Sequence, residues 1–148
     1  MTINKMNIDE LREQLIKLCL DWEKLLGVAP HITGAISEFD AMKLIGMSEK
    51  EILDESKDKT SRQKGHDFIH NDVKYQVKAN RPSYRKNSPV TITAKAKNYD
   101  FDKLIWILYN QEFVIQEAYE WNVNEYKEKC EFLKQVRPVH LRQGKRVA

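Results

Sequence analysis

The chain has 148 residues, the length of one ordinary domain, and is long enough to bury a hydrophobic core. Its 41% hydrophobic content, with three Trp, six Tyr and five Phe, excludes a disordered chain. The net charge of +3 does not by itself indicate a nucleic-acid partner. No stretch approaches the roughly 20 apolar residues of a membrane span. We expect a single cytoplasmic domain over residues 1–148 with no membrane partner.

Apolar residues recur at intervals of three and four over residues 8–26, which predicts an amphipathic helix. Asn7 is a suitable cap, and Gly27 is a suitable stop. Two roles stay open for this helix, since it can cover one side of a sheet or pair with a second copy of itself. Cys19 within it and Cys130 near the C-terminus are expected to be buried, reduced thiols.

A second helix is predicted from Ile36 to Gly46, and Glu38 stands near its first turn. Acids favour helix N-termini electrostatically, which is one explanation of Glu38. Ser48 and Glu51 form a capping-box pattern before a short third helix. The polar residues 56–64 are predicted to be a surface loop.

Residues 65–79 combine strand-like alternation with chemically useful side chains. Asp67 precedes a short apolar run, a turn follows, and residues 73–79 alternate between apolar and polar, so we expect a β-hairpin. Because successive strand side chains point to opposite faces, Gln76 and Lys78 share one face. The hairpin can bring Asp67 alongside them.

The proline-containing loop after the hairpin carries Arg81, Tyr84, Arg85 and Lys86, a composition suited to contacts with phosphates and bases. The alternative is an ordinary basic surface loop. Val90–Thr93, residues 103–109 and residues 112–119 are predicted strands. A final helix over residues 123–136 follows Asn122 as its cap. A basic tail is expected to be less ordered and contains Arg137, Arg142, Lys145 and Arg146.

An acidic residue followed by Gln-x-Lys on the next strand resembles the active-site signature of the restriction-endonuclease-like nucleases, the PD-(D/E)XK superfamily. The acid that usually precedes x-Lys is replaced by Gln76, as in branches of the superfamily that carry Q-x-K and remain nucleases. The resemblance extends over residues 33–121, and residues 65–80 carry its specific motif. It implies an α/β (α+β) fold with a restriction-endonuclease-like core, in which helices flank a central mixed β-sheet.

The resemblance also implies the chemistry of a site. Asp67, the amide oxygen of Gln76 and the backbone carbonyl of Val77 would bind Mg²⁺, for which Mn²⁺ can substitute, and Glu38 would contribute directly or through water. Lys78 would stabilise the transition state electrostatically. No small-molecule cofactor is expected. The alternative is that Gln76 and Lys78 are the solvent face of an antiparallel strand.

A zinc site at His66 and His70 is a weaker interpretation, because only two of the expected four ligands are visible. The sequence therefore predicts a Mg²⁺-dependent DNA endonuclease, of the restriction or mobile-element defence kind, that acts as a homodimer. The alternatives are a catalytically degenerate nuclease fold that binds nucleic acid, and a small interaction protein with an accidental Q-x-K strand.

Overall fold

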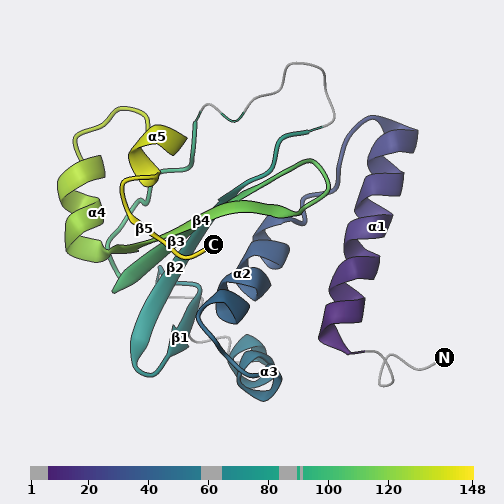
Figure 1. The fold of residues 1–148 in the computed structure, drawn as a ribbon, viewed down its shortest axis with the longest axis horizontal. Helices are drawn as coiled ribbons and strands as arrows, with labels where there is room; N and C mark the ends of the chain where they lie inside the picture. Colours follow the sequence, from purple (N-terminus) through teal and green to yellow (C-terminus); the bar gives the residue numbers. More distant parts are fainter. Residues whose placement is uncertain (1–6, 58–64, 84–89, 91) are drawn as a thin grey trace.

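Three helices open the fold: α1 (Ile8–Leu26), α2 (Thr33–Leu44) and α3 (Glu49–Lys57) (Figure 1). The fold comes from a computed structural model that describes residues 7–57, 65–83, 90 and 92–148. The side chain of Asn7 accepts a hydrogen bond from the backbone N–H of Glu10 at 2.8 Å, and Gly27 ends α1 at a φ of +82°. These two signals confirm the predicted bounds of α1.

Helix α2 begins at Thr33, before the predicted start at Ile36, and ends before Gly46. Glu38 therefore lies in the second turn of α2 and not in its first turn, which corrects the predicted placement. The electrostatic preference of acids for helix N-termini falls off within the first turn, so it does not account for Glu38.

The strands of the chain form one five-stranded mixed sheet in the order β1-β2-β3-β4-β5. Its strands are β1 (Phe68–His70), β2 (Val73–Asn80), β3 (Lys103–Tyr109), β4 (Ile115–Asn122) and β5 (Lys145–Arg146). Strands β2 and β3 are parallel, and the other neighbours are antiparallel. The fold is thus α+β, with the N-terminal helices first and further helices, α4 (Val123–Cys130) and α5 (Pro138–Leu141), flanking the sheet.

Alternation along β3 divides the core into two layers. Ile105 and Ile107 face one cluster, which contains buried residues of α1, α2 and α3, whereas Leu104 and Trp106 face a second cluster with buried residues of α4 and α5. All four side chains are fully buried. The sheet therefore lies between two helical layers, as Figure 1 shows.

Two predictions downstream of the hairpin are wrong. Val90–Thr93 is not a strand of the sheet: Thr93 forms only an isolated bridge to Val136, and residue 91 lies outside the described residues. The final helix, predicted over residues 123–136, ends at Cys130. Lys95 explains this early end, because its ammonium donates to the carbonyls of Glu131 and Leu133 just beyond the helix.

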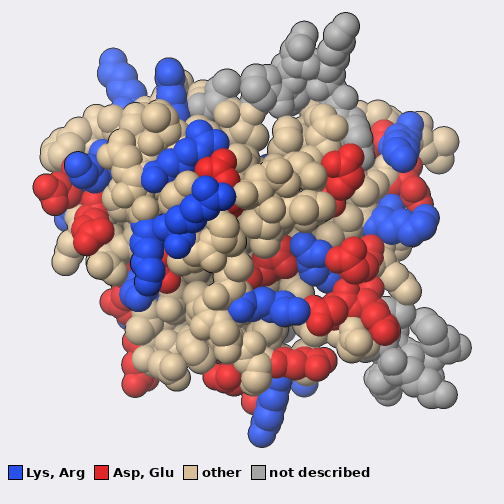
Figure 2. Space-filling view, viewed as in Figure 1, with Lys and Arg blue, Asp and Glu red and all other residues tan. Residues whose placement is uncertain are grey.

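The basic C-terminal tail is ordered, in contrast to the prediction. It forms α5 and then β5, which pairs with β4 through Tyr119↔Arg146 and Glu120↔Lys145. Lys and Arg side chains gather over these C-terminal elements (Figure 2). The tail is part of the sheet because Val147 and Ala148 also exchange backbone hydrogen bonds with Ala118.

An ion pair between Glu117 and Arg142 helps to hold the tail. Both bonds from the guanidinium to the carboxylate measure 2.8 Å, and the hydrogen bond to Arg142 is the main reason why the pKa of Glu117 lies below its ordinary value of 4.5. The stabilisation is therefore present above pH 4.5 and is lost as the pH falls through the lowered pKa.

We expect Glu117→Gln to reduce the free energy of unfolding at pH 7 by about 0.5–1 kcal/mol. Urea unfolding at pH 7 and pH 3 measures this difference, which should shrink at pH 3. Glu128→Gln, at an exposed site on α4, is the control and should have almost no effect. An equal effect of Glu117→Gln at both pH values would contradict an electrostatic origin.

Most of the apolar stripe of α1 is exposed. The residues that α1 buries are Ile16, Cys19 and Glu23, which lie on a neighbouring face of the helix. Leu18 and Leu25 are 67% and 84% exposed. Helix α1 thus docks through a mixed face on α2, on the β3–β4 connection and on Arg81. No helix in the described part of the chain has the length and apolar character needed to cross a membrane.

Candidate active site

The hairpin of β1 and β2 brings Asp67, the residue before β1, against the backbone of β2. The antiparallel ladder ends with the pair Phe68↔Tyr75. The N–H of Asp67 donates to the carbonyl of Tyr75 at 2.7 Å, and its carboxylate reaches the N–H of Val77. Asp67 therefore lies beside the stretch of β2 that contains Gln76.

The turn explains why this register forms. Asn71 and Asp72 connect the strands with φ angles of 50° and 64°. A type I′ turn requires positive φ at both central residues, and Asn and Asp tolerate this conformation better than other non-glycine residues. The predicted hairpin is thus confirmed, and its turn fixes the register.

Gln76 and Lys78 project from the face of β2 that is turned away from α1, α2 and α3. In the parallel ladder they lie beside Leu104 and Trp106 of β3, which are fully buried. Gln76 and Lys78 themselves are only half-buried. Within the described part of the chain, neither side chain has a hydrogen-bond or ion-pair partner. Their amide and ammonium groups are therefore available to a ligand.

The backbone of Val77 connects the two halves of the site. Its N–H donates to Oδ2 of Asp67 at 2.7 Å, which fixes the orientation of the carboxylate. The N–H and the C=O of a strand residue point toward the same neighbouring strand. The carbonyl of Val77 therefore points to the edge of β2 on which Asp67 lies.

The donor set of this site fits a hard divalent cation. Asp67, Gln76 and Val77 offer a carboxylate, an amide oxygen and a backbone carbonyl on one short part of the hairpin, and oxygen donors of this kind suit Mg²⁺. Among the described residues, no group of three or more His, Cys, Asp or Glu side chains is arranged to hold a metal ion. A metal at the hairpin would therefore depend on the neutral oxygens of Gln76 and Val77 as well as on Asp67.

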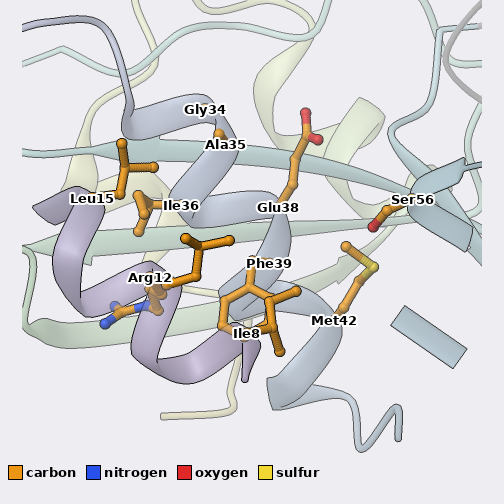
Figure 3. Close-up of a pocket in the computed structure, with 11 residues that line it drawn as sticks. Ile8, Arg12, Leu15, Gly34, Ala35, Ile36, Glu38, Phe39, Met42 and Ser56 are labelled. Carbon is orange, nitrogen blue, oxygen red and sulfur yellow. The ribbon is translucent and has the colours of Figure 1, made fainter. Parts of the chain in front are cut away.

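Glu38 lies on α2, on the other side of β2 from Gln76 and Lys78. It lines a groove between α1 and α2, and Figure 3 shows its carboxylate pointing away from Phe39 and Ile8. Glu38 has an interaction partner of its own. Its predicted contribution to a metal ion stays a prediction.

The basic loop divides into two parts. Arg81 is the first residue after β2, and its side chain is only 5% exposed because it pairs with Glu23 of α1 at 2.7 Å. Its guanidinium also lies 4.6 Å from the ring centroid of Phe113. Arg81 thus serves the packing of α1, and its predicted contact with DNA stays a prediction. Tyr84, Arg85 and Lys86 lie outside the described residues.

Two features of the hairpin were not anticipated. Asn80 continues the face of Gln76 and Lys78, and its Oδ1 accepts a hydrogen bond from Nε1 of Trp106 at 2.9 Å. The alternation of residues 76, 78 and 80 along the sequence could have predicted that Asn80 shares this face. His66 is 2% exposed, and neither ring nitrogen has a hydrogen-bond partner among the residues that the structure describes. His66 is therefore a core residue and not the sheet-edge residue that the sequence indicates.

Comparison with the models of known protein families and with curated proteins finds no match to this chain.

Proposed function

We propose that the protein is a Mg²⁺-dependent endonuclease that hydrolyses DNA phosphodiester bonds and is built on a restriction-endonuclease-like core. One observation carries this proposal. Asp67 is hydrogen-bonded to the backbone of Tyr75 and Val77, on either side of Gln76, and the ammonium of Lys78, which has no partner among the described residues, projects from the same face of β2 as Gln76. The arrangement groups a carboxylate, an amide and a cation where a phosphate can approach them.

Asp67, the amide oxygen of Gln76 and the carbonyl of Val77 would hold the cation. When bound, Mg²⁺ supplies a positioned water and neutralises negative charge on the phosphate. The hydrogen bond from the N–H of Val77 keeps Oδ2 of Asp67 in place. An ionised carboxylate can accept about four hydrogen bonds or ligands, and the bond from Val77 uses one of these positions.

Lys78 acts on the phosphate rather than on the cation. Its ammonium is a compact positive charge on a flexible stem, and no partner among the described residues neutralises it. It donates hydrogen bonds to the phosphate oxygens, where negative charge increases in the transition state. A protonated amine is a poor base, so Lys78 stabilises charge and does not remove a proton.

DNA is the proposed substrate because basic side chains flank the hairpin and the C-terminal elements. Lys74 lies on the same face of β2 as Lys78 and is exposed. A second basic group, over α5 and β5, contains Lys145 and Arg146 (Figure 2). Contacts of this kind bind the phosphate backbone without reading sequence. Tyr84, Arg85 and Lys86 remain predicted contacts of the same kind.

Cleavage of supercoiled plasmid DNA with Mg²⁺ or Mn²⁺ tests the proposal. We expect nicking or linearisation by the wild type and a loss of about 10²–10³-fold in rate for Lys78→Met, the loss typical of a missing transition-state donor. Asp67→Asn should remove cleavage as well. Lys74→Met is the matched control, since it deletes a lysine from the same strand and face and should change the rate only a few-fold.

The alternative function is a nucleic-acid-binding module that has lost catalysis, and the neutral Gln76 is the observation that favours it. Folded protein that binds DNA with strong salt dependence but cleaves none would support this alternative. The variant Gln76→Glu then tests whether the missing carboxylate is the cause of the lost cleavage. Cleavage gained by this variant would show that the missing carboxylate had silenced the site. Equal cleavage by wild type and Lys78→Met would refute the proposed roles.

A further inference from the structure

Helix α1 carries a seam of apolar side chains that faces solvent. We define the α1 seam as the residues that follow one another at alternating intervals of three and four, namely Ile8, Leu11, Leu15, Leu18, Trp22 and Leu25. This spacing is the a/d heptad pattern of helices that pair with another helix. Leu18, Trp22 and Leu25 are 67%, 55% and 84% exposed. Exposure of this extent on successive turns marks an interaction surface.

Apart from Ile8, which packs against the core cluster, the α1 seam is not the face that anchors α1 to its own domain. That anchoring face is built from Ile16 and Cys19 in the core and from the ion pair between Glu23 and Arg81. The docking of α1 on its own domain therefore does not account for the exposed part of the α1 seam.

We propose that the α1 seam binds the α1 seam of a second copy of this chain, in an antiparallel pair. A two-fold axis midway between Leu15 and Leu18 makes the seam self-complementary. In this register Leu15 meets Leu18 of the second copy, Leu11 meets Trp22, and Ile8 meets Leu25. Every seam residue then has an apolar partner. A contact of this kind is isologous and closes at two copies, so it forms a dimer and not a filament.

A groove beside the α1 seam supplies a place for the largest side chain. It lies between α1 and α2, has a volume of about 410 Å³, and contains Leu11 and Leu15 on one wall with Phe39 and Met42 on the other (Figure 3). The antiparallel register places Trp22 of the second copy opposite Leu11, at this groove. Large aromatic side chains in such pockets contribute most of the energy of many interfaces.

The size of the surface also suits a pair. Burying the α1 seam on both copies removes on the order of 1,000 Å² from water, which reaches the lower limit for a specific interface. The pairing does not depend on the proposed nuclease activity. It also leaves Gln76 and Lys78 uncovered, because they project from the face of the sheet away from α1.

Sedimentation equilibrium of the full chain tests the pairing. We expect a dimer for the wild type and a dissociation constant at least about 100-fold weaker for Leu18→Glu, which places two carboxylates in an apolar seam. Leu18 is mostly exposed in the single chain, so the variant should keep its circular dichroism and its Mg²⁺-dependent chemistry at Lys78. Phe132→Glu, at a residue 82% exposed outside the seam, is the matched control and should stay dimeric.

Disulfide trapping tests the register. A mixture of Leu11→Cys and Trp22→Cys proteins should form a cross-linked heterodimer under mild oxidation, whereas each protein alone should not. Cross-linking of Leu11→Cys with itself would show a parallel pair and overturn the proposed orientation. Two results would overturn the proposed surface. One is a wild type that stays monomeric at 100-fold the concentration used for circular dichroism, and the other is a dimer whose dissociation constant does not change in Leu18→Glu.

Discussion

Replacement of Asp40 by alanine is expected to lower the free energy of unfolding by about 3–5 kcal/mol, because it removes the buried counter-charge of Arg12 and leaves that guanidinium only the exposed Glu13. Asp40 is 6% exposed. It accepts hydrogen bonds from Nε and Nη2 of Arg12, each at 2.8 Å, and from Oη of Tyr109 at 2.6 Å. These residues come from α1, α2 and β3, so one carboxylate joins three elements that are distant in sequence.

The ionisation of Tyr109 supports this assignment. Burial, followed by the negative charge of Asp40, raises the pKa of Tyr109 well above its ordinary value of 10.0. The phenol therefore keeps its proton at neutral pH and acts as the donor. Tyr109→Phe removes a single bond while Arg12 still pairs with Asp40, and its cost should be nearer 1 kcal/mol.

Urea unfolding at pH 7 measures these changes, and a second ion pair between the same two helices provides the control. Asp9 of α1 pairs with Lys43 of α2 at 2.6 Å, but their side chains are 60% and 48% exposed. Asp9→Ala should cost no more than about 1 kcal/mol, since exposed pairs contribute little. If Asp40→Ala were no more costly than Asp9→Ala, burial would not be the source of the effect.

Local signals were sufficient for the elements that begin and end with specific side chains. Asn7 and Gly27 fix α1, and the alternation of residues 73–79 with the preceding turn fixes the hairpin. The approach of Asp67 to the segment of β2 that contains Gln76 also follows from these signals, because the turn sets which residues of the two strands lie side by side.

The sequence did not show which distant residues contact each other in the folded chain, and these long-range contacts account for the wrong predictions. The face that α1 buries contains Glu23, whose partner Arg81 is 58 residues away, so the apolar stripe alone did not identify this face. The order of the C-terminal tail depends on pairing with β4, and the early end of α4 depends on Lys95. Such pairings are properties of the folded chain and leave no local pattern.

The buried pair of Glu23 and Arg81 leads to the second large effect. Arg81→Met should lower the free energy of unfolding by about 3–5 kcal/mol, because it leaves Glu23 buried without a cation. The two side chains are 6% and 5% exposed. Arg81 also donates to the carbonyl of Gln111 and lies over the ring of Phe113, so the substitution loosens the contact between α1 and the β3–β4 connection as well.

A double-mutant cycle separates this structural role from DNA binding. Replacing both charges, as in Glu23→Leu with Arg81→Met, removes the unpaired carboxylate and should recover most of the stability lost by Arg81→Met alone. The double variant should also bind DNA as the wild type does, with an unchanged salt dependence. A phosphate contact would predict the opposite result, namely a salt dependence reduced by about one counterion despite recovered stability. Restored folding with intact DNA binding would therefore assign Arg81 to the attachment of α1, and leave Lys78 as the cation of the hairpin that meets the phosphate.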